Sequence, residues 1–433
     1  MRILKEFLQT QVKPTLGCTE PIAVALASAY ARSVVGGEIR KIEVLVDPNI
    51  FKNGMGAGIP NSNGKIGNIH AAALGAICGR ADRCLEVLDS VDEKAIRAAE
   101  KLIEEDSVVI EVLRSKSGIF IDARAITSQG LGRARIEGSH TNLTILEANG
   151  EDVLEQVNEG DEQAQKRKLF EGVKFATLFE ESLSIRDEER KKLLWVASKN
   201  EEAARYGLEN PCGLGVGQTF KGAVEEGLLG NDVANEAKIL TASAVDARMG
   251  GAPIGVIAVA GSGNQGLACT LPILAFCHKQ GIKDEEKLAK AMALAFLVTG
   301  YIKEQIGSLG ALCGCVMAAG SGSAAGIAQL MGGNCSSCAR GITNVLADLS
   351  GVICDGAKGG CALKLASAAN AAVQAAIMAQ KGLRVTSQDG IIDDEIEDTV
   401  ENLGILSNPG MTNTDQVILD IMIDKLKRGA YFS

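Results

Sequence analysis

Six cysteines gather within 49 residues near the end of the chain, at spacings that suit ligands of an inorganic centre. They are Cys313, Cys315, Cys335, Cys338, Cys354 and Cys361. Cys-x-Cys followed by Cys-x-x-Cys is compatible with a four-thiolate zinc site or with iron–sulfur ligation, and six unligated thiols are the alternative. Neighbouring glycines leave room for a bulky group, and Lys358 and Lys364 would offset the charge of ligated thiolates. We therefore expect a metal or cluster site in this region.

A further cysteine, Cys18, stands directly before a strong helix start, Thr19-Glu20-Pro21, with Thr19 as the expected capping hydroxyl. A thiol near a helix N-terminus gains from the helix dipole and from free N–H groups, so its pKa tends to fall. Glu20 opposes this effect. Cys18 is therefore a candidate catalytic thiolate, with a structural cysteine beside the helix cap as the alternative.

A glycine-rich loop, AGSGNQGLAC at 260–269, follows an apolar run and opens a helix. Its backbone N–H groups could hold a carboxylate, as helix N-termini do for small anions. The spacing is not that of a dinucleotide-binding fingerprint. The candidate substrate contacts in this loop are Ser262, Gly263, Asn264 and Gln265.

A second flexible loop at 53–64 carries Asn53 and Asn61, whose amides could reach a substrate. A solvated surface loop is the alternative reading of this segment. His140 lies at a turn into a predicted strand and could face a cleft, although a lone histidine is often structural. All three residues are candidate substrate contacts.

The composition argues against several classes of protein. A net charge of −10 over 433 residues disfavours a nucleic-acid surface and a basic membrane-docking face. The N-terminal stretch has no apolar core of a secretory signal, and the uncharged stretches Met249–His278 and Gln305–Ala339 are too polar for membrane spans. We expect a cytoplasmic protein that binds neither nucleic acid nor membrane, whose twelve cysteines form no disulfide framework.

The elements that must position these residues change type along the chain, which predicts an α+β protein. Residues 38–160 read as a small mixed α/β domain with a mostly antiparallel sheet, interrupted by helices at about 67–79 and 92–105. Residues 161–433 read as a large all-α domain of Ala- and Gly-rich helices that holds the cluster. Residues 1–37 should form N-terminal helices that pack on this helical domain and carry Cys18. Five strands are expected at IRKIEVLVD, SVVIEVL, GIFIDARAIT, LGRARIEG and TNLTILEANG.

Six segments, in order over nearly the whole chain, resemble the L-cysteine desulfidase family, which is related to the alpha chain of iron–sulfur L-serine dehydratases. They are PTLGCTEPIAVALASA, KNGMGAGIPN, EGSHTNLTILE, GSGNQGL, LCGCVMAAGSGSAAG and VICDGAKGGCALKLAS. The resemblance implies a [4Fe–4S] cluster held by three cysteines, with one iron left open. Cys354 and Cys361 would be two ligands and Cys313 the third, with Cys315 as its alternative. Cys335 and Cys338 would then lie outside the ligand set.

The resemblance also implies the reaction and the partners. The expected function is a β-eliminating lyase that converts L-cysteine to pyruvate, sulfide and ammonia, with Cys18 as the catalytic base and no pyridoxal phosphate. L-Serine dehydration by the same mechanism is the first alternative, and a non-catalytic zinc- or cluster-binding protein is the second. A homodimer is expected, with a small amino acid as the only other partner.

Overall fold

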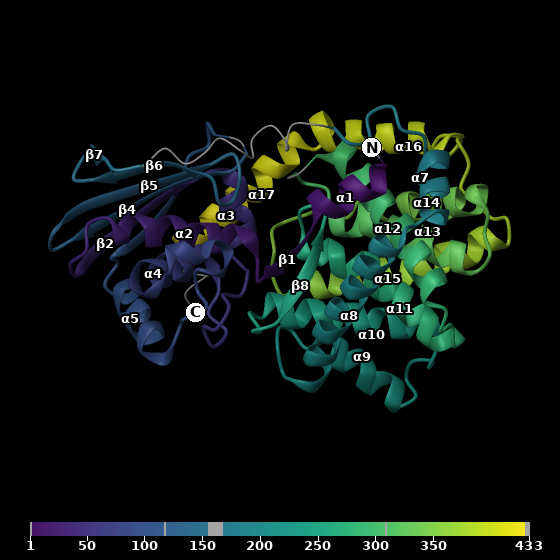
Figure 1. Cartoon of the computed structure of the whole chain (residues 1–433), viewed down its shortest axis with the longest axis horizontal. Coiled ribbons are helices and arrows are strands. Elements are labelled where there is room, and N and C mark those ends of the chain that lie inside the picture. Colours follow the sequence, from purple (N-terminus) through teal and green to yellow (C-terminus); the bar gives the residue numbers. More distant parts are fainter. Residues whose placement is uncertain (1, 117, 155–167, 308–309, 429–433) are drawn as a thin grey trace.

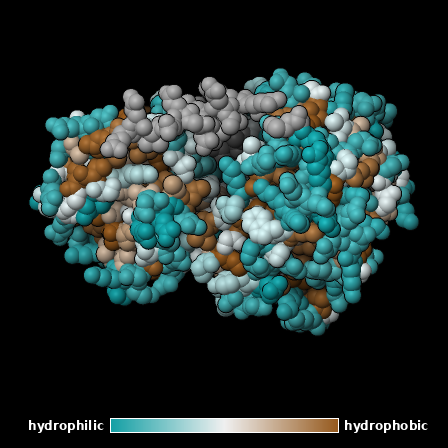
Figure 2. Space-filling view, in the orientation of Figure 1, coloured by the Kyte–Doolittle hydropathy of each residue, from teal (hydrophilic) through white to brown (hydrophobic). Residues whose placement is uncertain are grey.

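The computed structural model describes residues 2–116, 118–154, 168–307 and 310–428, and the fold is α+β, as expected. Two lobes stand side by side, one built on a sheet and one almost wholly helical (Figure 1). Figure 2 shows them as two bulges with a notch between them, and hydrophobic side chains reach the surface over the sheet lobe.

The helical lobe packs its helices around one large hydrophobic cluster. Its helices are α1 (Ile3–Gln11), α7 (Phe175–Leu183), α8 (Asp187–Glu209), α9 (Val216–Glu225), α10 (Val233–Met249), α11 (Gly263–Gln280), α12 (Glu285–Ile306), α13 (Gly314–Leu330), α14 (Cys335–Leu349), α15 (Cys361–Gln380) and α16 (Ile396–Ile405). Small residues let these helices approach closely. A Cβ added at Gly322 of α13 would lie 2.4 Å from the carbonyl oxygen of Ala295 on α12, so glycine is required at that crossing.

The sheet lobe has a second hydrophobic cluster between a six-stranded sheet and its helices. The strands are β2 (Ile39–Val46), β3 (Val108–Val112), β4 (Phe120–Thr127), β5 (Gly130–Glu137), β6 (Leu143–Ala148) and β7 (Glu151–Asp152), in the order β3-β2-β4-β5-β6-β7. The helices are α2 (Thr19–Ser33), α3 (Pro48–Gly54), α4 (Gly67–Cys78), α5 (Glu93–Glu104) and α17 (Thr412–Lys427). Only β2 and β3 pair in parallel, so the predicted, mostly antiparallel sheet is confirmed.

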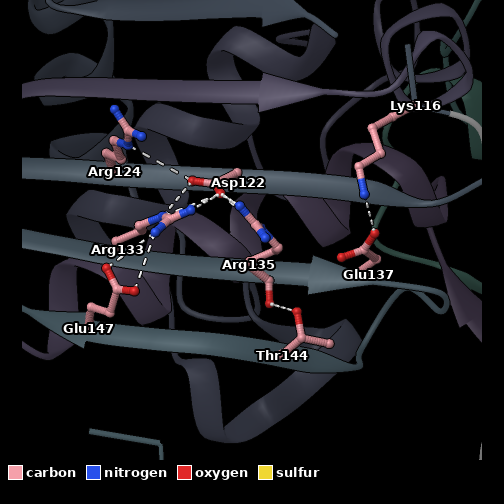
Figure 3. A network of polar contacts seen from close by, with 8 residues as sticks. All are labelled: Lys116, Asp122, Arg124, Arg133, Arg135, Glu137, Thr144 and Glu147. Carbon is pink, nitrogen blue, oxygen red and sulfur yellow. Dashed lines mark hydrogen bonds and ion pairs between the residues drawn. The ribbon is translucent and has the colours of Figure 1, made fainter. Parts of the chain in front are cut away.

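The two faces of this sheet differ because side chains alternate along each strand. Ile121 and Ala123 of β4 belong to the hydrophobic cluster, whereas Asp122 faces the opposite side. There it accepts hydrogen bonds from Arg133 (2.7 Å) and Arg135 (2.6 Å) of β5 (Figure 3). Arg133 also pairs with Glu147 of β6, so both acids of this network are paired with arginines.

Both ends of the chain cross between the lobes. Helix α1 packs in the helical cluster, as expected for residues 1–37, but α2 packs in the sheet cluster because its buried face meets β4, β5 and α4. Near the other end, α17 returns to the sheet lobe through Ile418, Leu419 and Met422. The expected boundary between residues 160 and 161 lies outside the described residues.

A two-stranded ladder, which the sequence pattern did not predict, joins the segments before α2 and α11. Strand β1 (Val12–Leu16) pairs antiparallel with β8 (Gly255–Val259). The N–H group of Ala260 also donates to the carbonyl of Gln11 at 3.0 Å. The start of α2 and the start of α11 are therefore held side by side.

Within the described residues, α15 is the one helix that is long and apolar enough to span a membrane. It packs among α10, α13 and α14 in the helical lobe. A core helix of this kind passes the same test, so this single helix is weak evidence for a membrane span.

Candidate functional site

A cavity of about 520 Å³ lies where the lobes meet, and residues from both line it. The polar and sulfur-bearing residues of its lining include Cys18, Thr19, Glu20, Asn53, His140, Arg248, Ser262, Asn264, Gln265, Lys303, Glu304, Cys313, Cys315, Cys354 and Cys361. Candidate residues from distant parts of the sequence thus meet in one place.

Backbone pairing explains how the two late cysteine segments come together. The N–H group of Cys313 donates to the carbonyl of Val352 at 3.0 Å, and that of Cys354 donates to the carbonyl of Ala311 at 2.6 Å. Leu312 and Ile353 form an isolated antiparallel bridge between these bonds. Cys361 follows on the first turn of α15, so its thiol joins the other three in the lining.

Some of these thiols contact one another, and burial opposes the ionisation of Cys313, Cys354 and Cys361. Cys313 hydrogen-bonds to Cys315 and Cys354, and the bond with Cys315, together with burial, raises the pKa of Cys313 to about 12. Its bond with Cys313 raises the pKa of Cys354 further above the usual range, and burial raises that of Cys361. The Cys315 Sγ lies 3.8 Å from the Ser262 hydroxyl. A bound metal centre would reverse these shifts, because a coordinating thiol is deprotonated.

The chemistry of the donor set is compatible with a cluster. Among the described residues, no three His, Cys, Asp or Glu side chains form a ready site for a metal ion. A cluster is bound by several thiolates, each on a different iron. Four thiols that share one cavity, on segments rich in glycine, suit that arrangement.

Cys18 is the N-cap residue of α2 and is buried. Its Sγ donates to the Glu20 carboxylate at 3.4 Å, and Thr19 donates to the same oxygen at 3.1 Å instead of capping the helix. Burial raises the pKa of Cys18, Glu20 raises it further, and only Arg248 acts to lower it. The expected fall in the pKa of Cys18 is therefore wrong: desolvation outweighs the helix N-terminus, and the resting residue is a thiol.

Four helices begin at this cavity. Cys18, Ser262 and Cys313 are the N-cap residues of α2, α11 and α13, and Cys361 is the first residue of α15. Each of these residues lines the cavity. Helix N-termini carry partial positive charge, so their convergence suits thiolates and an anionic ligand.

Three further predicted residues line the cavity, and two of them are already engaged. The Asn264 Oδ1 accepts from Arg248 at 3.0 Å, and the Gln265 amide donates to the carbonyls of Val259 and Ala260. Their side chains thus hold the loop in shape. His140 is different, because its Nε2 is buried without a hydrogen-bond partner.

Two predicted substrate contacts are placed elsewhere, while Asn53 is buried on α3 and lines the cavity. The Asn61 amide donates to the carbonyl of Leu88 at 3.2 Å within the sheet lobe, and Asn61 does not line the cavity. Gly263 does not line the cavity either. A Cβ there would lie 2.4 Å from Nε of Arg248, so Gly263 makes room for that guanidinium.

Sequence reasoning missed three cations: Lys52 and Arg248, which are buried, and Lys303, which is partly buried. Lys303 lies on α12 beside the late thiols; burial lowers its pKa, and Cys315 and Cys354 raise it. Lys52 is 2% exposed, pairs with Asp415 of α17 and acts to lower the pKa of Cys354. The available signal was a basic residue inside an apolar helix, as in DARMGG and TGYIKEQ.

The predicted charge-balancing lysines are shared with an acid. Lys358 and Lys364 both pair with Asp355 in the loop between Cys354 and α15. They also act to lower the pKa of Cys361. The two ion pairs with Asp355 mainly fix the conformation of this loop.

Comparison with known proteins extends over most of the chain. A family model described as the serine dehydratase alpha chain matches residues 82–420, a span that includes His140 and the late thiols but not Cys18. A UPF0597 protein of Clostridioides difficile is 42% identical over 98% of this chain and 99% of its own length. UPF0597 proteins of Alkaliphilus oremlandii and Bacteroides fragilis are 40% and 38% identical, each over 96% of this chain and over 96% and 97% of their own lengths.

Proposed function

Because the chain belongs to the serine dehydratase alpha-chain family, we propose that it is a [4Fe–4S]-dependent β-eliminating lyase for a small L-amino acid. The observation that carries the proposal is the single cavity in which Cys18 meets the late thiols. Elimination needs a base for the α-proton and an electrophile for the β-leaving group. Cys18 would supply the base, and the late thiols would hold the cluster that supplies the electrophile.

The cluster would be held by Cys354, Cys361 and Cys313, with Cys315 as the alternative to Cys313. When bound, a cluster with an open iron supplies a Lewis acid for the β-substituent of the substrate. The four helix N-termini described above favour the charge of the ligated thiolates.

Proton abstraction is the task of Cys18. At rest its thiol donates a hydrogen bond to the Glu20 carboxylate, and it must give its proton to solvent before it acts as the base. The thiolate then takes the α-proton as the leaving group departs. Because burial raises the pKa of Cys18, the thiolate is a stronger base than an exposed one. The 2-aminoacrylate product is hydrolysed to pyruvate and ammonia.

L-Cysteine is the first substrate to test, because Cys18 lies in the segment that resembles the desulfidases. L-Serine is the second, and the name of the matched family favours it. Asn53 and the unpartnered Nε2 of His140 are the proposed polar contacts to either substrate. The homodimer also stays a prediction, which a measured mass in solution checks.

Anaerobic purification followed by metal and product analysis tests the proposal. We expect a brown protein with about four irons per chain that releases pyruvate from L-cysteine or L-serine, with sulfide from the former. Cys18→Ala should abolish pyruvate release and keep the iron absorbance. A colourless protein with one tightly bound zinc and no turnover would contradict the proposal and support the non-catalytic alternative.

A further inference from the structure

Arg248, in the last turn of α10, is a buried cation without an acidic partner. It is 4% exposed and lines the cavity. Its Nη1 donates to Asn264 at 3.0 Å, its Nη2 donates to the carbonyl of Gly17 at 2.7 Å, and its Nε has no partner. Throughout the described parts of the chain, no carboxylate lies within ion-pair distance of its guanidinium.

An unpaired buried guanidinium is costly, because it cannot lose its proton. The chain nevertheless fixes this group from two sides. Asn264 and Gly17 orient its two terminal nitrogens, and the missing side chain of Gly263 gives its Nε space. A guanidinium that is fixed by two hydrogen bonds beside a cavity, and that has further N–H donors, suits an anionic ligand.

The charge at Arg248 belongs to the Cys18 end of the cavity. Arg248 acts to lower the pKa of Cys18, whereas the cations that act on Cys354 and Cys361 are lysines. Glu20 lies at the same end and accepts from Cys18 and Thr19 through one carboxylate oxygen, Oε2. A cation, bonded to the carbonyl of Gly17, and an acid, bonded to Cys18 itself, thus both lie near the thiol that is proposed to take the α-proton.

We propose that Arg248 binds the α-carboxylate of the substrate and that Glu20 binds its α-ammonium group. The inference rests on the proposed function and narrows the substrate class to free α-amino acids with both groups unblocked. With the two groups fixed at either side of Cys18, the α-carbon lies next to the thiol. Asn264 and Gly263 then serve the carboxylate indirectly, by positioning Arg248.

Binding of unreactive probes to the anaerobically purified protein tests this pairing by calorimetry. L-Alanine has both groups and no leaving group, propionate lacks the amine, and ethylamine lacks the carboxylate. We expect Arg248→Gln to weaken L-alanine and propionate about 30-fold and to leave ethylamine unchanged. Glu20→Gln should weaken L-alanine and ethylamine and leave propionate unchanged. Thermal unfolding of both variants checks that they fold.

Equal weakening of all probes by both variants would assign the two residues a structural role and overturn the proposal. Wild-type protein that does not bind L-alanine would overturn it as well. If wild type binds L-alanine in the predicted pattern but releases no pyruvate, the proposed function fails and this inference stands. If wild type releases pyruvate and Arg248→Gln leaves KM unchanged, the inference alone fails.

Discussion

Two groups of charged residues in this molecule are built in opposite ways. On the open face of the sheet, Asp122 is held by Arg133 and Arg135, and Glu147 balances Arg133 (Figure 3). In the cavity, Arg248 is buried with no carboxylate in reach among the described residues. The first group is complete without a ligand and stabilises the sheet. The second lacks a negative charge, which indicates that its ligand is an anion.

The largest effect should follow from removing a thiol from the cavity that contains Arg248. Cys354→Ser is expected to lower pyruvate release by at least about 1000-fold and to reduce the iron content, because a cluster ligand is lost. Cys335→Ser, half-buried on α14 and absent from the cavity lining, is the matched control and should keep both. Full iron content and turnover in Cys354→Ser would show that the late thiols are not the ligands.

Lys52 of α3 and Asp415 of α17 form a complete ion pair, and breaking it should lower the stability of the fold. Asp415→Ala leaves Lys52 buried with, among the described residues, only the carbonyl of Gly310 as partner, so we expect a loss of about 3 kcal/mol in the free energy of unfolding. Denaturant unfolding measures it. Adding Lys52→Met should restore most of the loss, because no unpaired charge then remains. If Asp415→Ala alone is as stable as wild type, the pair is not desolvated.

The sheet network should show a smaller loss of stability and no loss of function. Asp122 is 5% exposed, but its arginines are partly solvated, so Asp122→Asn should cost about 2 kcal/mol and leave KM unchanged. Glu137→Gln, at the end of β5, breaks an exposed pair with Lys116, which lies between β3 and β4, and should cost under about 0.5 kcal/mol. A change in KM for Asp122→Asn would break the distinction between the two groups.

The smallest effect concerns pH. Burial alone would raise the pKa of Asp355, but hydrogen bonds from Lys358 and Lys364 outweigh it and hold the pKa at about 2. This value lies below the usual one of about 3.9, so Asp355 stabilises the fold above pH 4, and its contribution is lost as the pH falls toward 2. The stability difference between wild type and Asp355→Asn should therefore shrink over that interval. A difference that stays constant with pH would refute this role.

Local patterns in the sequence predicted the elements well, since alternation in IRKIEVLVD and the start at Thr19-Glu20-Pro21 depend on neighbouring residues alone. Pairings between distant segments left no such signal. The β1–β8 ladder joins residues about 240 positions apart, and α17 was not assigned to the sheet lobe. Asn53 and Asn61 show the same limit: both are amides of one loop, and only packing decides that one reaches the cavity.

The pKa of Cys18 could not have been predicted from its position before α2. The helix N-terminus is visible in the sequence, but the burial that opposes it comes from residues of the other lobe. Arg248 was missed for a related reason, because a basic residue in an alanine-rich helix gives no hint of what faces it.

The position of α17 has a consequence for biosynthesis. The strands of the sheet lobe are synthesised before most of the helical lobe, yet the hydrophobic cluster of the sheet lobe includes Ile418, Leu419 and Met422 of α17. A nascent chain therefore exposes part of that cluster until α17 has been synthesised. The buried Lys52 likewise gains Asp415 only at that point. The sheet lobe therefore cannot complete its hydrophobic cluster before most of the helical lobe has been made.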